Sequence, residues 1–197
     1  MLLYHRLAAS CAITLVSAGI AAVPTPALAE GPLSVALQAV IPSGNGGGDF
    51  SGTTQLGLGL GYDFGPPIVV PVRATAQFDY NGGSNGGSSL STYGFTVGAR
   101  LTTPIYAGIG IGPYFTSFKQ PVFGPALVGR TPILIFTGPS SVTTTSAGLG
   151  TKFTVGDRIL SLPGGVSLAL EASYQLLPTV AGSTDPSAAR LGLRLHI

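Results

Sequence analysis

The charged residues that could do chemistry alternate with small or apolar residues along short segments of the chain. Arg73 and Asp79 share one set of alternate positions, and Arg190 and Arg194 share another near the end of the chain. Alternate side chains of a β-strand lie on one face, so these charges point away from the apolar positions. In a closed barrel they would form an interior charge cluster. Its expected members are Asp63, Arg73, Arg100, Lys152, Glu171, Arg190 and Arg194.

Two interpretations of this charge cluster remain open. It could form a gate or a charged constriction, with Lys152 and Glu171 pairing across the lumen with one of the last two arginines. Alternatively, it is a structural ion cluster that fills the barrel, because eight strands leave room for little beyond side chains. We favour the second interpretation. Glycines occupy many other inward positions, where they either accommodate basic side chains and the rings of Tyr106 and Tyr114 or leave a narrow water-filled path.

The sequence offers no set of residues for catalysis or for metal binding. After residue 29 the single histidine is His196, and no cysteine follows that point. A hydrolase needs a nucleophile, a base and an orienting acid placed together, and His196 has no such partners in a recognisable motif. Metal sites need several ligands of suitable type. The glycines at 57, 59 and 61 belong to strand alternation and precede no helix, unlike a dinucleotide-binding loop. We therefore expect a protein that is not an enzyme and has no metal or cofactor.

Composition narrows the class of protein. Of 197 residues, 45% are hydrophobic and 8% are charged, whereas an average soluble domain carries about 25% charged residues. The 30 glycines and 16 prolines disfavour long helices. The net charge is +2 with no basic block, which gives nucleic-acid binding no electrostatic support. A membrane β-barrel and a secreted soluble β-sandwich remain.

Residues 1–29 have the pattern of an export signal. A short positive start precedes an uncharged apolar run over residues 7–23, and two prolines follow it. Ala27 and Ala29 then form a small-x-small cleavage site before Glu30. A transmembrane anchor is the alternative, but the run is at the short limit for spanning a bilayer. We expect a signal peptide over residues 1–29 and an exported domain over residues 30–197.

The exported part alternates apolar and polar residues in eight segments, the pattern of half-buried strands. Each segment has about the length that crosses a bilayer at a tilt. The expected strands cover residues 32–41, 52–64, 68–80, 90–103, 105–116, 143–155, 166–176 and 188–197. The sequence thus predicts an all-β fold, an eight-stranded antiparallel up-and-down transmembrane β-barrel that follows a signal peptide.

The connections between the expected strands alternate in length. Residues 65–67 and 103–104 form short links and residues 156–165 an intermediate one, which suits the periplasmic side of an outer-membrane barrel. The other links are longer or looser and are expected outside: 42–50, 81–89, 119–140 and 178–187. The strongly apolar loop 119–140 is either an extension of two strands as a hairpin or a contact surface for a partner, lipid or apolar solute.

Aromatic residues are expected to cluster at both ends of the lipid-facing rows, as membrane interfaces favour. With this orientation, the outer group comprises Phe78, Tyr80, Tyr93, Phe95, Phe115 and Tyr174. The inner group comprises Tyr62, Phe64 and Phe153. Core aromatics of a soluble sandwich would not cluster at strand ends, so this pattern favours the barrel.

The exported chain resembles the small eight-stranded outer-membrane barrels, the OmpA-like superfamily that includes the OmpW and OmpX types. The most specific part of the resemblance is the C-terminal strand. Its residues Arg190, Gly192, Leu195 and Ile197 are similar to the signal that barrel-assembly machinery recognises. Family members usually end in an aromatic residue, and Ile197 differs. The resemblance implies outer-membrane localisation, contact with outer-membrane lipid and binding of the assembly machinery during biogenesis.

Together these observations predict a non-enzymatic integral outer-membrane protein with a structural or surface-interaction role. One alternative is a narrow channel for small or hydrophobic solutes. A second alternative is a secreted soluble β-sandwich. Arginine at Leu58 or Ala74 should harm insertion if these residues face lipid.

Overall fold

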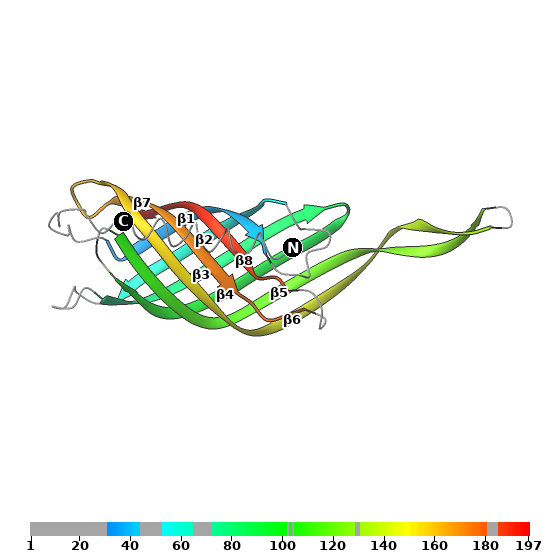
Figure 1. Ribbon diagram of the computed structural model, residues 1–197, viewed down its shortest axis with the longest axis horizontal. Coiled ribbons are helices and arrows are strands. Elements are labelled where there is room, and N and C mark those ends of the chain that lie inside the picture. The colour runs from blue at the N-terminus through cyan, green and yellow to red at the C-terminus, as the bar shows by residue number, and fades with distance from the viewer. Residues whose placement is uncertain are drawn as a thin grey trace, which may run out of the picture.

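The protein folds as a closed barrel of eight antiparallel strands, each paired with its neighbours in chain order, and β1 pairs with β8 (Figure 1). The computed structural model describes residues 31–43, 53–64, 72–101, 103, 105–128, 131–180 and 185–197, and only the backbone over residues 122–140. The predicted signal peptide lies outside these residues. The strands are β1 (Leu33–Pro42), β2 (Gln55–Phe64), β3 (Val72–Asn85), β4 (Ser88–Leu101), β5 (Ile105–Val128), β6 (Thr131–Ser161), β7 (Ser167–Leu176) and β8 (Ala188–His196). The predicted fold class is confirmed.

Polar and charged residues face the barrel interior, and apolar residues face outward. In β2 the buried and exposed positions alternate without a break, so that Leu58 is exposed while Gly57 and Gly59 are buried. The same alternation runs through β1 and most of β7. An apolar outer surface around a polar interior is the pattern of a barrel that is surrounded by lipid. In the described part of the chain, no helix is long and apolar enough to cross a membrane.

The two ends of the barrel carry different connections. β1 begins beside the end of β8, where Leu33 and Ile197 exchange backbone hydrogen bonds of 3.2 and 2.8 Å. We call this the terminal end. At the other end, β3 is joined to β4 and β5 is joined to β6, and we call it the hairpin end. Tyr93 and Phe115 stack near the hairpin end, with ring centroids 5.2 Å apart.

Two predicted links are wrong because the strands continue through them. Residues 81–89 were expected as a flexible loop, but β3 and β4 stay paired up to Asn85 and Ser88. Gly86 and Gly87 alone form the turn, with φ of 58° and 86°, which is the left-handed conformation that a two-residue hairpin turn requires. Similarly, β6 pairs with β7 as far as Ser161, so the expected link over residues 156–165 is shorter.

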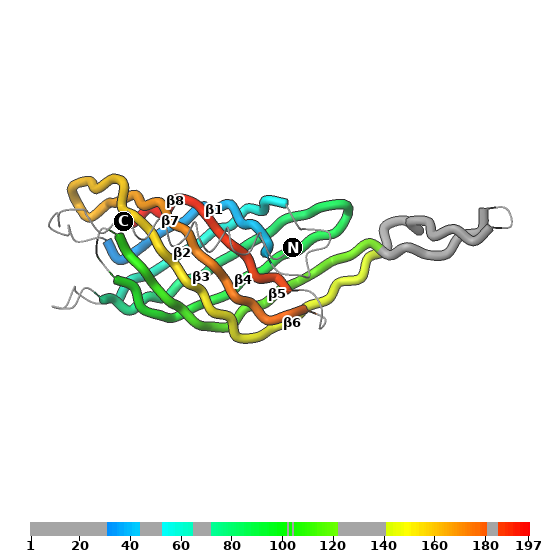
Figure 2. The backbone as a smooth tube through the Cα atoms, viewed as in Figure 1, coloured from blue at the N-terminus to red at the C-terminus, as the bar shows by residue number. Residues whose placement is uncertain are grey.

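β5 and β6 extend far beyond the other strands as one hairpin (Figures 1 and 2). β5 has 24 residues and β6 has 31. Their pairing runs from Ile105 opposite Asp157 to Val128 opposite Thr131, with one register shift between Pro121 and Phe123. The hairpin interpretation of residues 119–140 is confirmed. Whether the segment is also a contact surface stays a prediction.

We expect Leu58→Arg to destabilise the folded protein in lipid by about 2–4 kcal/mol, the cost of a basic side chain near the bilayer midplane. Leu58 lies at the middle of β2 and its side chain is 46% exposed on the outer face. The measurement is a urea titration in vesicles, with the folded fraction read from the gel shift between unboiled and boiled protein. Leu58→Ile is the matched control. If Leu58→Arg folds as well as the control, the outward register of β2 is wrong.

Candidate functional site

The candidate site is the barrel interior, where the structure places all seven members of the predicted charge cluster. Each is less than 10% exposed, and so is Asp79. Among the described residues, five buried cations therefore share the interior with three buried carboxylates. Because an unpaired buried charge is strongly unfavourable, the arrangement of ion pairs decides what the interior can do.

Glu171 on β7 is the centre of the first group of contacts. Arg194 on β8 holds both carboxylate oxygens: Nη2 donates to Oε1 at 2.8 Å and Nε donates to Oε2. Gln38 donates to Oε1 at 2.8 Å, and the Tyr106 hydroxyl donates to Oε2 at 3.0 Å. Arg194 also donates to Ser34 at 2.9 Å. Side chains of β1, β5, β7 and β8 thus meet at one fully buried carboxylate.

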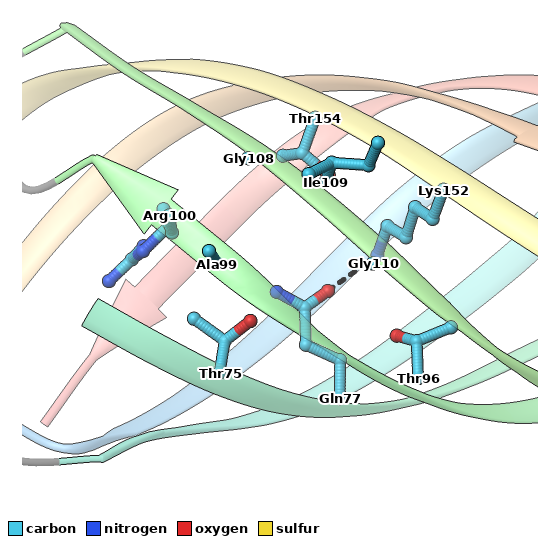
Figure 3. Close-up of a pocket in the computed structure, with 10 residues that line it drawn as sticks. All are labelled: Thr75, Gln77, Thr96, Ala99, Arg100, Gly108, Ile109, Gly110, Lys152 and Thr154. Atoms are coloured by element: carbon cyan, nitrogen blue, oxygen red, sulfur yellow. Dashed lines mark hydrogen bonds between the residues drawn. The ribbon is translucent and has the colours of Figure 1, made fainter. Parts of the chain in front are cut away.

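Asp79 on β3 is the centre of the second group. Its Oδ1 accepts from Lys152 at 2.9 Å and from Arg190 at 2.6 Å. Lys152 also donates to Gln77 at 2.9 Å, as the dashed line in Figure 3 shows. One carboxylate therefore balances two cations from β6 and β8. Of the predicted pairing among Lys152, Glu171 and one of the last two arginines, the structure shows the ion pair between Glu171 and Arg194, whereas Lys152 pairs with Asp79.

A third group lies at the terminal end. Arg100 on β4 forms an ion pair with Asp63 on β2. Its Nη1 lies 3.1 Å from Nε2 of His196, and its guanidinium lies 4.8 Å from the ring centroid of Tyr106. Arg73 faces Arg100 across the β3–β4 pair and is buried as well. His196, at the end of β8, is thus part of the interior contacts.

Glycines on the inner wall make room for the large interior side chains. A Cβ at Gly156 would lie 2.2 Å from the Tyr106 ring, and one at Gly94 would lie 2.2 Å from the Tyr114 ring. A Cβ at Gly57 would lie 2.9 Å from the Arg190 guanidinium. At Gly57 and Gly94 the first of the two predicted roles is confirmed, because side chains occupy the space.

One cavity in the barrel interior is small. A cavity between β3, β4, β5 and β6, lined in part by Gln77, Thr96 and Lys152 (Figure 3), has a volume of about 10 Å³. That is about the space that one water molecule requires. Toward the hairpin end, Leu90 and Phe118 on the inner wall form a buried apolar cluster with Val180, which follows β7. Val180 therefore packs against the inner wall near this end of the barrel.

No protein-family model and no curated protein match the chain. A structure of Ail, the attachment invasion locus protein of Yersinia pestis, is similar at a TM-score of 0.55 and 13% identity, over 85% of this chain and 99% of that one. Ail in complex with the heparin analogue sucrose octasulfate is similar at a TM-score of 0.53 and 12% identity, over 85% of this chain and 97% of that one. For Neisserial surface protein A the TM-score is 0.49 and the identity is 12%, over 84% of this chain and 93% of that one.

The fold is that of the small eight-stranded outer-membrane barrels. Within that fold, the predicted assembly signal divides between the two faces of β8. Arg190 faces inward, while Leu195 and Ile197 lie on the outer face. A Cβ at Gly192 would lie 2.0 Å from the carbonyl oxygen of Leu37, so glycine permits the close approach of β8 to β1 that closes the barrel. Recognition by assembly machinery stays a prediction.

Within the described ranges, no three His, Cys, Asp or Glu side chains are grouped so that they could hold a metal ion. The contacts of His196 include Arg100 and Tyr106, and neither of these two contacts is a nucleophile and base pair of the hydrolase type. The absence of enzymatic activity, cofactor and metal stays a prediction.

Proposed function

We propose that this protein is an integral outer-membrane barrel that neither catalyses nor conducts, and that its role is structural or carried by the surface it presents outside the membrane. The observation that carries the proposal is that side chains from opposite walls meet in the barrel interior. Glu171 and Asp79 bind side chains from several walls of the barrel, and the cavity between β3 and β6 holds about one water molecule. An interior of this kind stabilises the barrel and obstructs passage.

The outer surface supports the membrane part of the proposal. Large apolar side chains are exposed on every strand of the barrel, such as Leu37, Leu60, Val97, Ile109 and Leu193. In water a continuous apolar surface of this extent would aggregate, whereas lipid solvates it. Outer-membrane lipid is therefore the first partner. The second is the barrel-assembly machinery, which would act on the last strand during biogenesis.

Planar-bilayer conductance is the experiment that tests the proposal. Folded protein, verified by its gel shift on boiling, is added to a bilayer, with a large porin as the positive control. We expect no discrete current steps, because the side chains that meet at Asp79 and Glu171 cross the lumen. Discrete steps from the folded protein would instead establish the alternative, a narrow channel. Recovery in the aqueous fraction after carbonate washing would contradict the membrane assignment itself.

A further inference from the structure

The outer face of the barrel is hollowed near the terminal end, where β3, β4 and β5 pair with one another. The hollow has a volume of about 340 Å³. We call it the outer groove, and its apolar lining consists of Val72, Ala99, Leu101, Ala107, Gly108 and Ile109. Arg100 also borders it, but this side chain is buried and forms an ion pair with Asp63 inside the barrel. The outer groove is therefore apolar, and it lies on the face that the proposed function places in lipid.

The sequence produces the hollow by placing small residues between large ones. One outward row crosses the sheet from β2 to β6 and consists of Phe64, Ala74, Ala99, Ile109 and Phe153. All five side chains are exposed, and the two alanines rise less from the sheet than the rings at the two ends of the row. The next outward residue of β5 toward the terminal end is a third alanine, Ala107. The outer surface is thus lower over β3 and β4 than over β2 and β6.

We propose that the outer groove holds one acyl chain of a phospholipid from the leaflet at the terminal end, an inference that rests on the proposed membrane location. Lipid tails are as apolar as leucine, so the hydrophobic effect does not hold a chain against the barrel within the bilayer. Van der Waals contact does, and atoms that line an unfilled hollow lose that contact on one side. A flexible hydrocarbon chain can touch the floor and the walls of the groove at once, whereas on a convex surface it touches one side only.

The shape and the charge of the groove favour an acyl chain over the other groups that meet this face. A flat strand or helix of another membrane protein would meet Phe64 and Phe153 before it reached the alanines between them. A lipid headgroup would find no outward charge among the described residues that line the groove, since Arg100 faces Asp63. Leu101 is the last residue of β4, so the groove opens where the strands end. We therefore expect the contact to depend on the chain and not on the headgroup.

Retention of phospholipid through purification tests the site. The exported chain is folded in vesicles of phosphatidylcholine and phosphatidylglycerol, insertion is verified by flotation and gel shift, and native mass spectrometry counts the lipids that remain after detergent extraction. We expect one retained phospholipid, with no preference between the headgroups. Ala99→Phe fills the groove and should lower retention about tenfold through lost van der Waals contact. Ala172→Phe is the matched control, because Ala172 is an outward alanine of β7 between Val155 and Leu191, and it should retain lipid like the unaltered chain.

A phosphatidylcholine with a photoreactive diazirine in the middle of one acyl chain locates the site without any substitution. After irradiation, trypsin separates residues 74–100 and 101–119, which include the floor of the groove, from residues 159–190, which include β7. The label should concentrate in the first two peptides. An inserted chain that retains no lipid, a marked headgroup preference, equal retention by the two phenylalanine variants, or label spread evenly over the three peptides would each overturn the inference. Failure of the chain to insert would instead overturn the proposed function.

Discussion

Glu171→Gln is expected to lower the free energy of unfolding in lipid by about 3 kcal/mol or more, the usual effect of removing one partner of a buried ion pair. The Arg194 guanidinium would lose the negative charge of the carboxylate to which two of its nitrogen atoms donate. Tyr106 and Gln38 also donate to this carboxylate, so their donors would compete for the single remaining carbonyl oxygen. No solvent can compensate, since Glu171 is fully buried.

The measurement is a urea titration of vesicle-reconstituted protein, followed by the gel shift because the chain has no tryptophan. Asp157→Asn is the matched control: it removes the same charge from an exposed position on β6, where the effect should be below about 0.5 kcal/mol. Glu171→Met with Arg194→Met should recover only part of the loss, because an apolar pair can replace the buried ion pair but leaves the Tyr106 and Gln38 donors without this acceptor. Equal stability of Glu171→Gln and the control would mean that this contact does not support the barrel.

The strands and their inward faces could be predicted because a lipid-exposed barrel imposes an alternation of period two on its sequence. In β2, for example, Leu58 and Leu60 alternate with Gly57, Gly59 and other inward residues. This constraint acts only where lipid surrounds the strand. Asn81–Ser89 contains only Asn, Gly and Ser, so it shows no apolar alternation and its sequence predicts a loop, although Gly86 and Gly87 allow a tight turn between paired strands.

The members of the interior charge cluster and the pairing of Glu171 with an arginine of the last strand could be predicted, but the partner of Lys152 could not. Alternation gives the face of a side chain, and strand order gives its neighbours. It does not give the distance that a long side chain reaches across the lumen. Lys152 on β6 reaches Asp79 on β3, a strand that is not adjacent, and Tyr106 reaches Glu171 from β5. Tyrosines on an inward row opposite glycines are the signal that could have indicated such crossings.

Asp79→Asn should destabilise the barrel at least as much as Glu171→Gln, by about 3–5 kcal/mol, because it leaves two cations without their shared carboxylate. Lys152 and Arg190 both donate to Oδ1 of Asp79, at 2.9 and 2.6 Å. Asparagine can still accept a hydrogen bond, so the loss measures the charge rather than the contact. The two cations would then repel each other in an interior where the described residues already carry more positive than negative charge.

Removing one of the two cations separates this electrostatic effect from a loss of packing. Lys152→Met keeps most of the side-chain volume, and in the Asp79→Asn background it should restore stability, because one buried cation fewer needs compensation. In the unaltered background the same substitution leaves Asp79 paired with Arg190 and should cost less than Asp79→Asn. The urea titration of all three variants gives a double-mutant cycle with a coupling energy of about 1–3 kcal/mol. Additive effects within error would show that Lys152 and Asp79 act independently, contrary to the contact that joins β3 to β6.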